Sequence, residues 1–275
     1  MKILDGKLVS DKIKHKLTKE VNQLDSKPGL AVIQVGNEAA SEIYVNNKQK
    51  AATEIGLEFR HLHFGNISEE DLILEIIKLN NDDAIDGIIV QLPLPRYMNE
   101  ELVLNSIDAG KDVDGLTDIN LGKLFSNKDC YIPCTPLGIT ELLNEYKIDV
   151  AGKNVVIVGR SRLVGKPMAM LLLNMDATVT ICHSKTIDLA EFTSHADILI
   201  VAVGKRGLIG PKMVKNDVII IDVGINRIDN KLYGDVLFDD VIDKVKYITP
   251  VPGGVGPMTV VSLLKNTIES YKKRH

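Results

Sequence analysis

Lys48 has the residue type and the surroundings that proton chemistry requires. If residues 41–56 form a helix, Lys48 shares one face with uncharged residues, namely Tyr44, Ala51, Ala52 and Ile55. A lysine on such a face ordinarily extends its ammonium group to solvent. The alternative is a desolvated lysine, whose lowered pKa allows proton exchange near neutral pH. The spacing alone leaves both interpretations open.

Gln91 and two aspartates are further polar candidates. Gln91 interrupts the apolar segment 86–95 near its end, which in an α/β sheet is the edge where ligands bind. A buried amide needs partners, which a ligand, a lysine or nearby backbone could supply. Asp112 and Asp114 would share one face of a strand and could act as an acid–base pair. A solvated turn accounts for the two aspartates equally well.

The segment 155–167 resembles a phosphate-binding turn between a strand and a helix. It is not a Walker A loop, because Gly159 and Gly165 enclose five residues instead of four and Pro167 replaces the magnesium-binding hydroxyl. It also departs from the standard dinucleotide fingerprint, because Ser161 stands at the second glycine position. A variant dinucleotide turn and a turn without a ligand both remain possible.

The residues after the next expected strand favour NADP over NAD as the dinucleotide. An NAD site usually presents a carboxylate there, whereas the segment 183–186 contains Ser184 and a lysine but no acid. These groups would suit an additional phosphate, and Arg160 could close over it from the first turn. A polar loop without a ligand is the alternative interpretation of 183–186.

A segment rich in glycine and proline, 249–259, precedes the last expected helix. Glycines allow the backbone to approach a ligand closely, and N–H groups at a helix start can hold an anion or a polar ring. A stiff loop without a ligand would have the same composition.

Alternating apolar and amphipathic segments position these candidates and indicate an α/β fold. Helices are expected at 41–56 with Ser41 as N-cap and Gly56 as stop, at 68–79 with Ser68 as N-cap, and at 135–146, 165–174, 187–195 and 257–275. Strands are expected at 30–36, 86–95, 154–158, 177–182, 197–203 and 218–223. We expect two α/β domains with a ligand cleft between them, the second a doubly wound parallel sheet, and a boundary near 118–135.

Composition excludes several classes of protein. The 275 residues carry a formal net charge of −4, which argues against nucleic acid as a general partner. We see no apolar run long enough to span a membrane and no signal peptide. The three cysteines lack metal-ligand spacing, so we expect no metal site and interpret them as packing or loop residues. Their odd number, without a secretory signal, indicates reduced thiols and a cytoplasmic location.

The motifs together resemble the bifunctional methylenetetrahydrofolate dehydrogenase/methenyltetrahydrofolate cyclohydrolase family along essentially the whole chain. The matching segments are Tyr44-x-x-x-Lys48, VQLPLP at 90–95, KDVDG at 111–115, PCTP at 133–136, GRSxxVGxP at 159–167, CHSKT at 182–186 and PGGVGPMT at 252–259. The resemblance implies NADP-dependent oxidation of 5,10-methylenetetrahydrofolate, followed by hydrolysis of the methenyl product to 10-formyltetrahydrofolate.

The resemblance also implies an organisation and a set of site residues. It implies a folate-binding catalytic domain at 1–119, a Rossmann-like NADP domain at 120–256 through which the protein forms a homodimer, and a last helix, 257–275, that returns to the first domain. The catalytic lysine corresponds to Lys48, with Tyr44 against the folate ring, Gln91 contacting the lysine and Asp114 binding the pterin. Further folate contacts are implied for Val90, Leu92, Pro252, Gly253, Gly254, Val255 and Gly256. NADP contacts are implied for Gly159, Arg160, Ser161, Ser184 and Ile225.

One residue departs from the family pattern, and two other functions compete with this one. Arg206 stands where we expect proline in many members, in a loop near the cofactor. The first competitor is an NADP-dependent dehydrogenase of another small substrate, without cyclohydrolase activity. The second is a non-catalytic NADP-binding sensor, which would leave Tyr44, Lys48, Gln91 and Asp114 without a role.

Overall fold

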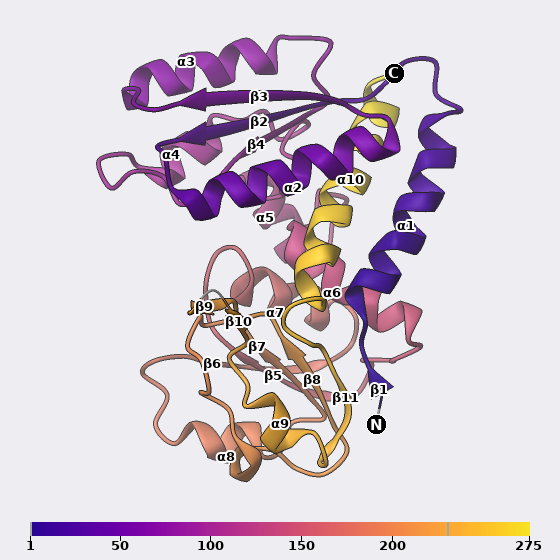
Figure 1. Ribbon diagram of the computed structural model, residues 1–275, viewed down its shortest axis with the longest axis vertical. Coiled ribbons are helices and arrows are strands. Elements are labelled where there is room, and N and C mark those ends of the chain that lie inside the picture. The colour runs from indigo at the N-terminus through magenta and orange to yellow at the C-terminus, as the bar shows by residue number, and fades with distance from the viewer. Residues whose placement is uncertain (1, 230) are drawn as a thin grey trace. The chain divides into compact units, whose positions relative to one another are not determined.

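The computed structural model describes residues 2–229 and 231–275, which form two compact units (Figure 1). The six-stranded unit consists of the chain up to Asp11 together with Thr135–Thr259. The three-stranded unit consists of Lys12–Cys134 and Val260–His275. Two long helices, α1 (Gly6–Val21) and α10 (Val255–Arg274), contribute residues to both units.

The six-stranded unit contains a parallel sheet in which the strands that follow β5 (Asn154–Val158) in the chain lie on both sides of it. The strand order is β1 (Lys2–Ile3), β11 (Val245–Ile248), β8 (Val218–Asp222), β7 (Ile198–Val201), β5 and β6 (Thr178–Cys182). Because β6 and β7 both follow β5 in the chain and pair with its opposite sides, the switch point of a doubly wound sheet lies here. All four residues of β7 are buried, as expected for an internal parallel strand.

Short helices and a hairpin complete the six-stranded unit. The helices are α6 (Cys134–Glu145), α7 (Gly165–Leu173), α8 (Leu189–Thr193), α9 (Phe238–Val241) and the 3₁₀ helix η1 (Pro211–Met213). The hairpin pairs β9 (Asn226–Ile228) with β10 (Lys231–Tyr233) in antiparallel register. The segment between β8 and β11 therefore contains a small antiparallel ribbon.

The three-stranded unit has a parallel sheet in the order β3 (Glu58–Phe64), β2 (Gly29–Val35) and β4 (Gly87–Val90). Helices α2 (Ala39–Ile55) and α3 (Glu69–Asn80) cover opposite faces of this sheet (Figure 1). The central strand β2 is consequently buried along its whole length. Helices α4 (Glu100–Asn105) and α5 (Asp118–Phe125) follow β4 in the chain.

Local signals predicted most helix ends, but one N-cap prediction is wrong. Ser68 accepts the N–H of Asp71 and caps α3 as predicted, and Gly56 ends α2 in the left-handed conformation. Helix α2, however, begins at Ala39, so Ser41 is a buried residue inside the helix and not its cap. The residue at the N-cap position is Glu38, whose side chain makes no capping hydrogen bond.

The two units divide the chain at other residues than the family resemblance implied, although their changeover lies within the predicted boundary segment 118–135. We expected residues 1–119 in one domain and 120–256 in the other, whereas the units change over between Cys134 and Thr135. The first residues also belong to the six-stranded unit, because β1 pairs with β11. Residues 260–275 belong to the three-stranded unit, and Asn266 donates its amide to the carbonyl of Val113 there at 2.9 Å.

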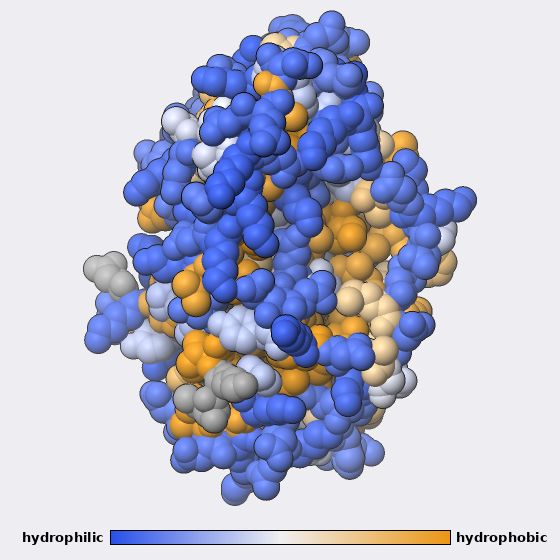
Figure 2. All heavy atoms as spheres, turned by 90° about the vertical axis from the view of Figure 1, so that its right-hand side faces the viewer, coloured by the Kyte–Doolittle hydropathy of each residue, from blue (hydrophilic) through white to orange (hydrophobic). Residues whose placement is uncertain are grey.

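Polar residues predominate on the face of the molecule that Figure 2 shows. Hydrophilic side chains cover much of the face shown in Figure 2, and apolar residues reach the surface in smaller areas between them. Within the described part of the chain, no helix has the length and apolar content needed to cross a membrane.

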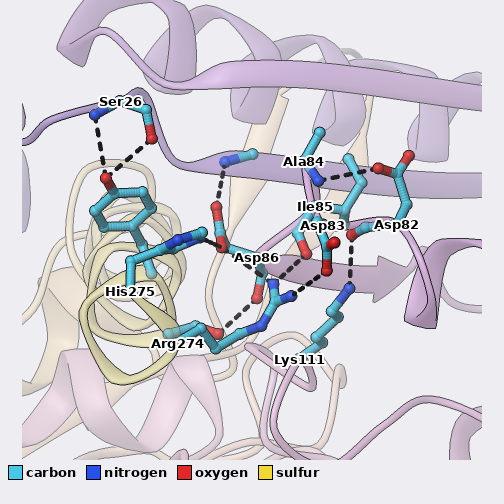
Figure 3. Close-up of polar contacts among 12 residues, drawn as sticks. Ser26, Asp82, Asp83, Ala84, Ile85, Asp86, Lys111, Arg274 and His275 are labelled. Atoms are coloured by element: carbon cyan, nitrogen blue, oxygen red, sulfur yellow. Dashed lines mark hydrogen bonds and ion pairs between the residues drawn. The ribbon is translucent and has the colours of Figure 1, made fainter.

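A buried carboxylate anchors the last turn of α10 (Figure 3). Asp86 accepts the backbone N–H of Gly29 at 2.8 Å and pairs with Arg274 at 3.1 Å and His275 at 3.3 Å. The hydroxyl of Ser270 donates to the Asp86 carbonyl at 2.6 Å. The Asp86 side chain is 3% exposed, so removing its cationic partner would leave a desolvated charge.

We therefore expect Arg274→Ala to lower the free energy of unfolding by about 2 kcal/mol, because Asp86 keeps its burial and loses its main counterion. Lys273→Ala is the matched control, since Lys273 pairs with Asp129, which is 85% exposed, and should cost less than about 1 kcal/mol. Urea unfolding of both variants measures the difference. Equal losses would show that Asp86 does not depend on Arg274.

Candidate functional site

Lys48 and Gln91 meet in the structure, although 43 positions separate them in the chain. The ammonium of Lys48, in the middle of α2, donates to Oε1 of Gln91 at 2.8 Å. Gln91 directly follows β4, and its own amide donates to the carbonyl of Leu92 at 2.7 Å. The two bonds together orient the Gln91 amide, with its oxygen toward the lysine. The predicted partnership between this glutamine and a lysine is present.

The helix face that carries Lys48 passes from core to surface. Ala52 and Ile55 lie in the core, Lys48 is half-buried, and Tyr44 is 41% exposed. The face therefore does not extend Lys48 fully into solvent, and it leaves the ring of Tyr44 accessible one turn away. Burial lowers the pKa of Lys48, while the charge of Asp114 opposes this shift.

Asp114 and Cys134 complete the polar group around Lys48. Burial raises the pKa of Asp114, whereas the Lys48 charge and a hydrogen bond from the Cys134 thiol act in the opposite direction. The Cys134 sulfur also lies 3.3 Å from the carbonyl of Val113. Burial thus disfavours the charged form of both groups, and the charge of each offsets part of this effect on the other.

Cys134 is a residue that sequence reasoning did not select. Cys134 stands in the PCTP segment, but we interpreted the cysteines as packing or loop residues because their spacing does not suit a metal. Only the fold places this thiol beside Asp114, at the first residue of α6. Burial raises the pKa of Cys134 well above its usual value, so the thiol stays protonated and can act as a hydrogen-bond donor.

Asp112 does not form a pair with Asp114 on one strand face. Asp112 forms an isolated parallel β-bridge with Ile88, and Val113 and Asp114 lie in the turn that follows it. The Asp112 carboxylate accepts the backbone N–H groups of Leu116 at 3.1 Å and Thr117 at 2.8 Å. It also accepts the side-chain amide of Asn120 at 2.9 Å. Asp112 thus shapes the loop that presents Asp114, and the hypothesis of an acid–base pair is wrong.

The turn after β5 has the geometry of a close-packed strand-to-helix connection. Gly159 has φ +128°, and a Cβ there would lie 2.4 Å from the carbonyl oxygen of Ala202. A Cβ on Gly165 would lie 2.2 Å from the carbonyl oxygen of Gly159. Only glycine fits both positions, so the turn and the start of α7 can pack against each other.

The polar residues predicted to hold the dinucleotide lie at the carboxyl edge of the parallel sheet. Val158 of β5 is in register with Cys182 of β6, so the loops that follow both strands leave the sheet side by side. Arg160 and Ser184 are exposed in these two loops. Ser161 accepts the N–H of Val164 at 3.1 Å through its hydroxyl, which orders the turn. Ile225, after β8, is 43% exposed.

The glycine-rich segment 252–256 is packed against its own unit. A Cβ on Gly6 would lie 1.8 Å from the carbonyl oxygen of Gly254, and the carbonyl of Gly253 accepts the N–H of Lys7 at 2.9 Å. These glycines are needed for backbone packing whether or not a ligand binds. Helix α10 begins at Val255, two residues before the Pro257 at which we predicted its start.

The remaining predicted residues divide between the units. Val90 is buried in β4, and Leu92 is half-buried beside Gln91. The Lys48 group lies in the three-stranded unit, whereas the turn at 159–161 and the segment 252–256 lie in the six-stranded unit. Among the described residues, no cluster of three His, Cys, Asp or Glu side chains could hold a metal ion.

Comparison with known proteins gives consistent matches over both units. Residues 4–114 match the model of the tetrahydrofolate dehydrogenase/cyclohydrolase catalytic domain, and residues 133–275 match that of its NAD(P)-binding domain. The bifunctional protein FolD of Campylobacter hominis is 51% identical over 279 residues, covering 100% of this chain and 98% of that protein.

Solved structures agree with these matches. The bifunctional FolD enzyme of Campylobacter jejuni has a TM-score of 0.98 and 49% identity, with all of both chains covered. The Trypanosoma brucei methylenetetrahydrofolate dehydrogenase–cyclohydrolase, crystallised with NADP and an inhibitor, has a TM-score of 0.94 and 39% identity. That alignment covers 98% of this chain and 96% of the trypanosomal one.

Proposed function

The chain belongs to the tetrahydrofolate dehydrogenase/cyclohydrolase family, and we propose that it carries out both reactions of that name in one-carbon folate metabolism. It oxidises 5,10-methylenetetrahydrofolate with NADP⁺ and then hydrolyses the methenyl product to 10-formyltetrahydrofolate. The observation that carries this proposal is the hydrogen bond between Lys48 and Gln91, formed beside Asp114.

The oxidation transfers a hydride from the methylene carbon to NADP⁺, leaving the methenyl cation and NADPH. The nicotinamide supplies the redox chemistry, so the residues of the chain need only bind and orient. Gly159 and Ser161 would hold the pyrophosphate at the start of α7, and Ile225 would border the nicotinamide. Arg160 and Ser184 would contact the 2′-phosphate, because their loops leave neighbouring strand ends.

The hydrolysis requires proton transfer, which we assign to Lys48. Water adds to the methenyl carbon and loses a proton to the neutral amine of Lys48. The resulting ammonium then donates a proton to N5 as the bond between N5 and the carbon breaks. The hydroxyl on that carbon loses its proton to solvent at the same stage, which leaves the neutral formyl group on N10. The lowered pKa of Lys48 makes the neutral amine accessible, and the acceptor Oε1 of Gln91 aims it.

The remaining residues around Lys48 would bind the folate. Asp114 would accept N–H groups of the pterin, and the exposed ring of Tyr44 would pack against it. Val90 and Leu92 would supply further contacts on the three-stranded unit. The segment 252–256 would supply contacts as well.

We expect Lys48→Met to abolish the cyclohydrolase reaction while folate binding largely persists, because only proton transfer needs the amine. The loss should be about 10²-fold or more. Decay of methenyltetrahydrofolate absorbance, corrected for uncatalysed hydrolysis, measures it. Lys50→Met is the control, since Lys50 is exposed on the same helix. Normal hydrolysis by the Lys48 variant would contradict the assignment.

The pH dependence tests the same residue in another way. Because burial lowers the pKa of Lys48, the neutral base should become populated, and kcat should rise, at a pH below the usual lysine range. Lys48→Arg keeps the positive charge without an exchangeable proton near neutral pH, so the rise of kcat with pH should disappear. If kcat of the arginine variant still rises with pH, the titrating group is a residue other than Lys48.

We expect Arg160→Ala to raise the KM for NADP⁺ by about tenfold or more and to change the KM for NAD⁺ little, because only NADP⁺ carries the 2′-phosphate. Lys153→Ala removes the same charge at the opposite end of β5 and serves as control. Initial rates with each cofactor measure the effect. Equal changes for both cofactors would count against this role of Arg160.

We also propose that the protein is a cytoplasmic homodimer that assembles through the six-stranded unit. Strand β6 is the edge of its sheet, and edge strands present unpaired backbone groups to a partner. Apolar side chains lie exposed on and around this edge, namely Leu173, Ile181 and Ile187, the last 90% exposed. The three cysteines are free thiols, which suits a reducing compartment.

The expected effect of Ile181→Lys is a shift from dimer to monomer, because it places a charge on the proposed interface. Ile77→Lys is the control, since Ile77 is similarly exposed on α3 of the other unit. Light scattering would show twice the chain mass of 30.3 kDa for the wild type and the control, and a single chain mass for Ile181→Lys. A wild-type monomer would refute the dimer.

A further inference from the structure

Three loops of the six-stranded unit surround the switch point of its sheet. Val158 of β5 is in register with Val201 of β7, and Val201 is in register with Asp222 of β8. The segments that follow these strands, 159–161, 202–206 and 223–225, therefore leave the same edge of the sheet. Ligands of open α/β sheets bind at this edge, so the positions of these loops affect the affinity for the ligand.

A single buried carboxylate holds the loop that follows β7. Asp235 is 0% exposed, and its Oδ2 accepts the backbone N–H groups of Val203 at 2.8 Å and Gly204 at 2.9 Å. Its Oδ1 accepts the backbone N–H of Lys205 at 2.7 Å and the side-chain amide of Asn226 at 2.9 Å. Three consecutive backbone donors thus converge on one side chain.

The same carboxylate lies against the loop that follows β8. A Cβ on Gly224 would lie 2.1 Å from Cγ of Asp235, so only glycine allows this approach. Gly224 directly precedes Ile225, the residue assigned to the nicotinamide. Asp222 in turn accepts the backbone N–H groups of Asp235 and Val236, both at 2.9 Å, and holds the Asp235 segment at the end of β8. Asp235 therefore joins two of the three loops.

Arg206, which stands where we expected proline, also connects the loop after β7 to the segment that contains Asp235. The guanidinium of Arg206 lies 3.7 Å from the ring centroid of Tyr233, which belongs to β10. This cation–π contact ties the next residue of the β7 loop to the hairpin that leads to Asp235. The arginine thus has a specific partner where we expected proline.

We propose that Asp235 is a positioning residue for NADP⁺, which fixes the loops at 203–205 and 224–226 around the nicotinamide end of the cofactor. This inference rests on the proposed function. Asparagine at position 235 has nearly the same shape, but either orientation of its amide turns an NH₂ group toward two N–H donors. The loops must then move, and a displacement of about 1 Å can reduce catalysis by about 10²-fold.

The test compares two activities of one protein, because only the dehydrogenase reaction uses NADP⁺. For Asp235→Asn we expect the KM for NADP⁺ to rise about tenfold and the dehydrogenase kcat to fall. Hydrolysis of added methenyltetrahydrofolate, without NADP⁺, should stay within about twofold of wild type. Calorimetric titration with NADP⁺ should show the same loss of affinity as the KM. A merely structural role would lower both activities together, and that result would overturn the proposal.

Two further variants complete the experiment. Asp197→Asn is the control, because Asp197 accepts the N–H of Asn154 at 2.8 Å at the opposite end of β7 and should leave the KM for NADP⁺ unchanged. If Asp235→Asn does not fold, Asn226→Ala removes one donor and should raise this KM about threefold. An unchanged KM there would overturn the proposal. A wild-type protein without dehydrogenase activity would instead refute the proposed function.

Discussion

A partly desolvated ammonium next to an amide oxygen is the contact on which the site depends. Removing Lys48 from water disfavours its charge, and the oxygen of Gln91 and the carboxyl of Asp114 offset part of that cost. Lys48 comes from helix α2, Gln91 follows β4, and Cys134 is the first residue of α6. These residues therefore meet only when the three-stranded unit is folded.

Buried carboxylates in this protein serve two different purposes. Asp112 and Asp235 accept backbone N–H groups of loops and thereby fix segments that have no regular structure of their own. Asp86 accepts the N–H of Gly29 at the start of β2 and pairs with Arg274 in the last turn of α10. Asp114 has no such set of backbone donors among its described contacts and lies beside Lys48 and Cys134 instead. The acid that we propose to bind the pterin is thus the one without backbone donors among its described contacts, while the oxygens of the others are occupied by the chain.

Elements with strong local signals were predictable, and those defined by pairing were not. Ser68 and Gly56 mark helix ends because their capping depends on residues three or four positions away. β3 is an exposed edge strand with polar and apolar residues mixed, so its pattern did not reveal it. β1 is only two residues long and exists because it pairs with β11, more than 240 positions later. Local sequence carries no signal for such a partner.

The sequence by itself determined the residue types, the motifs and, through them, the family, the two reactions and the choice of NADP. It also placed Lys48 on a mostly apolar face, because helical periodicity is a local property. Tertiary structure decided which neighbours this lysine has, that Cys134 joins Asp114, that the Asp112 carboxylate accepts backbone N–H groups of its own loop, and that Asp235 fixes the loops beside the switch point. The physical reason is that these contacts follow from strand order and register, which bring distant segments together and are set by the packing of the whole unit.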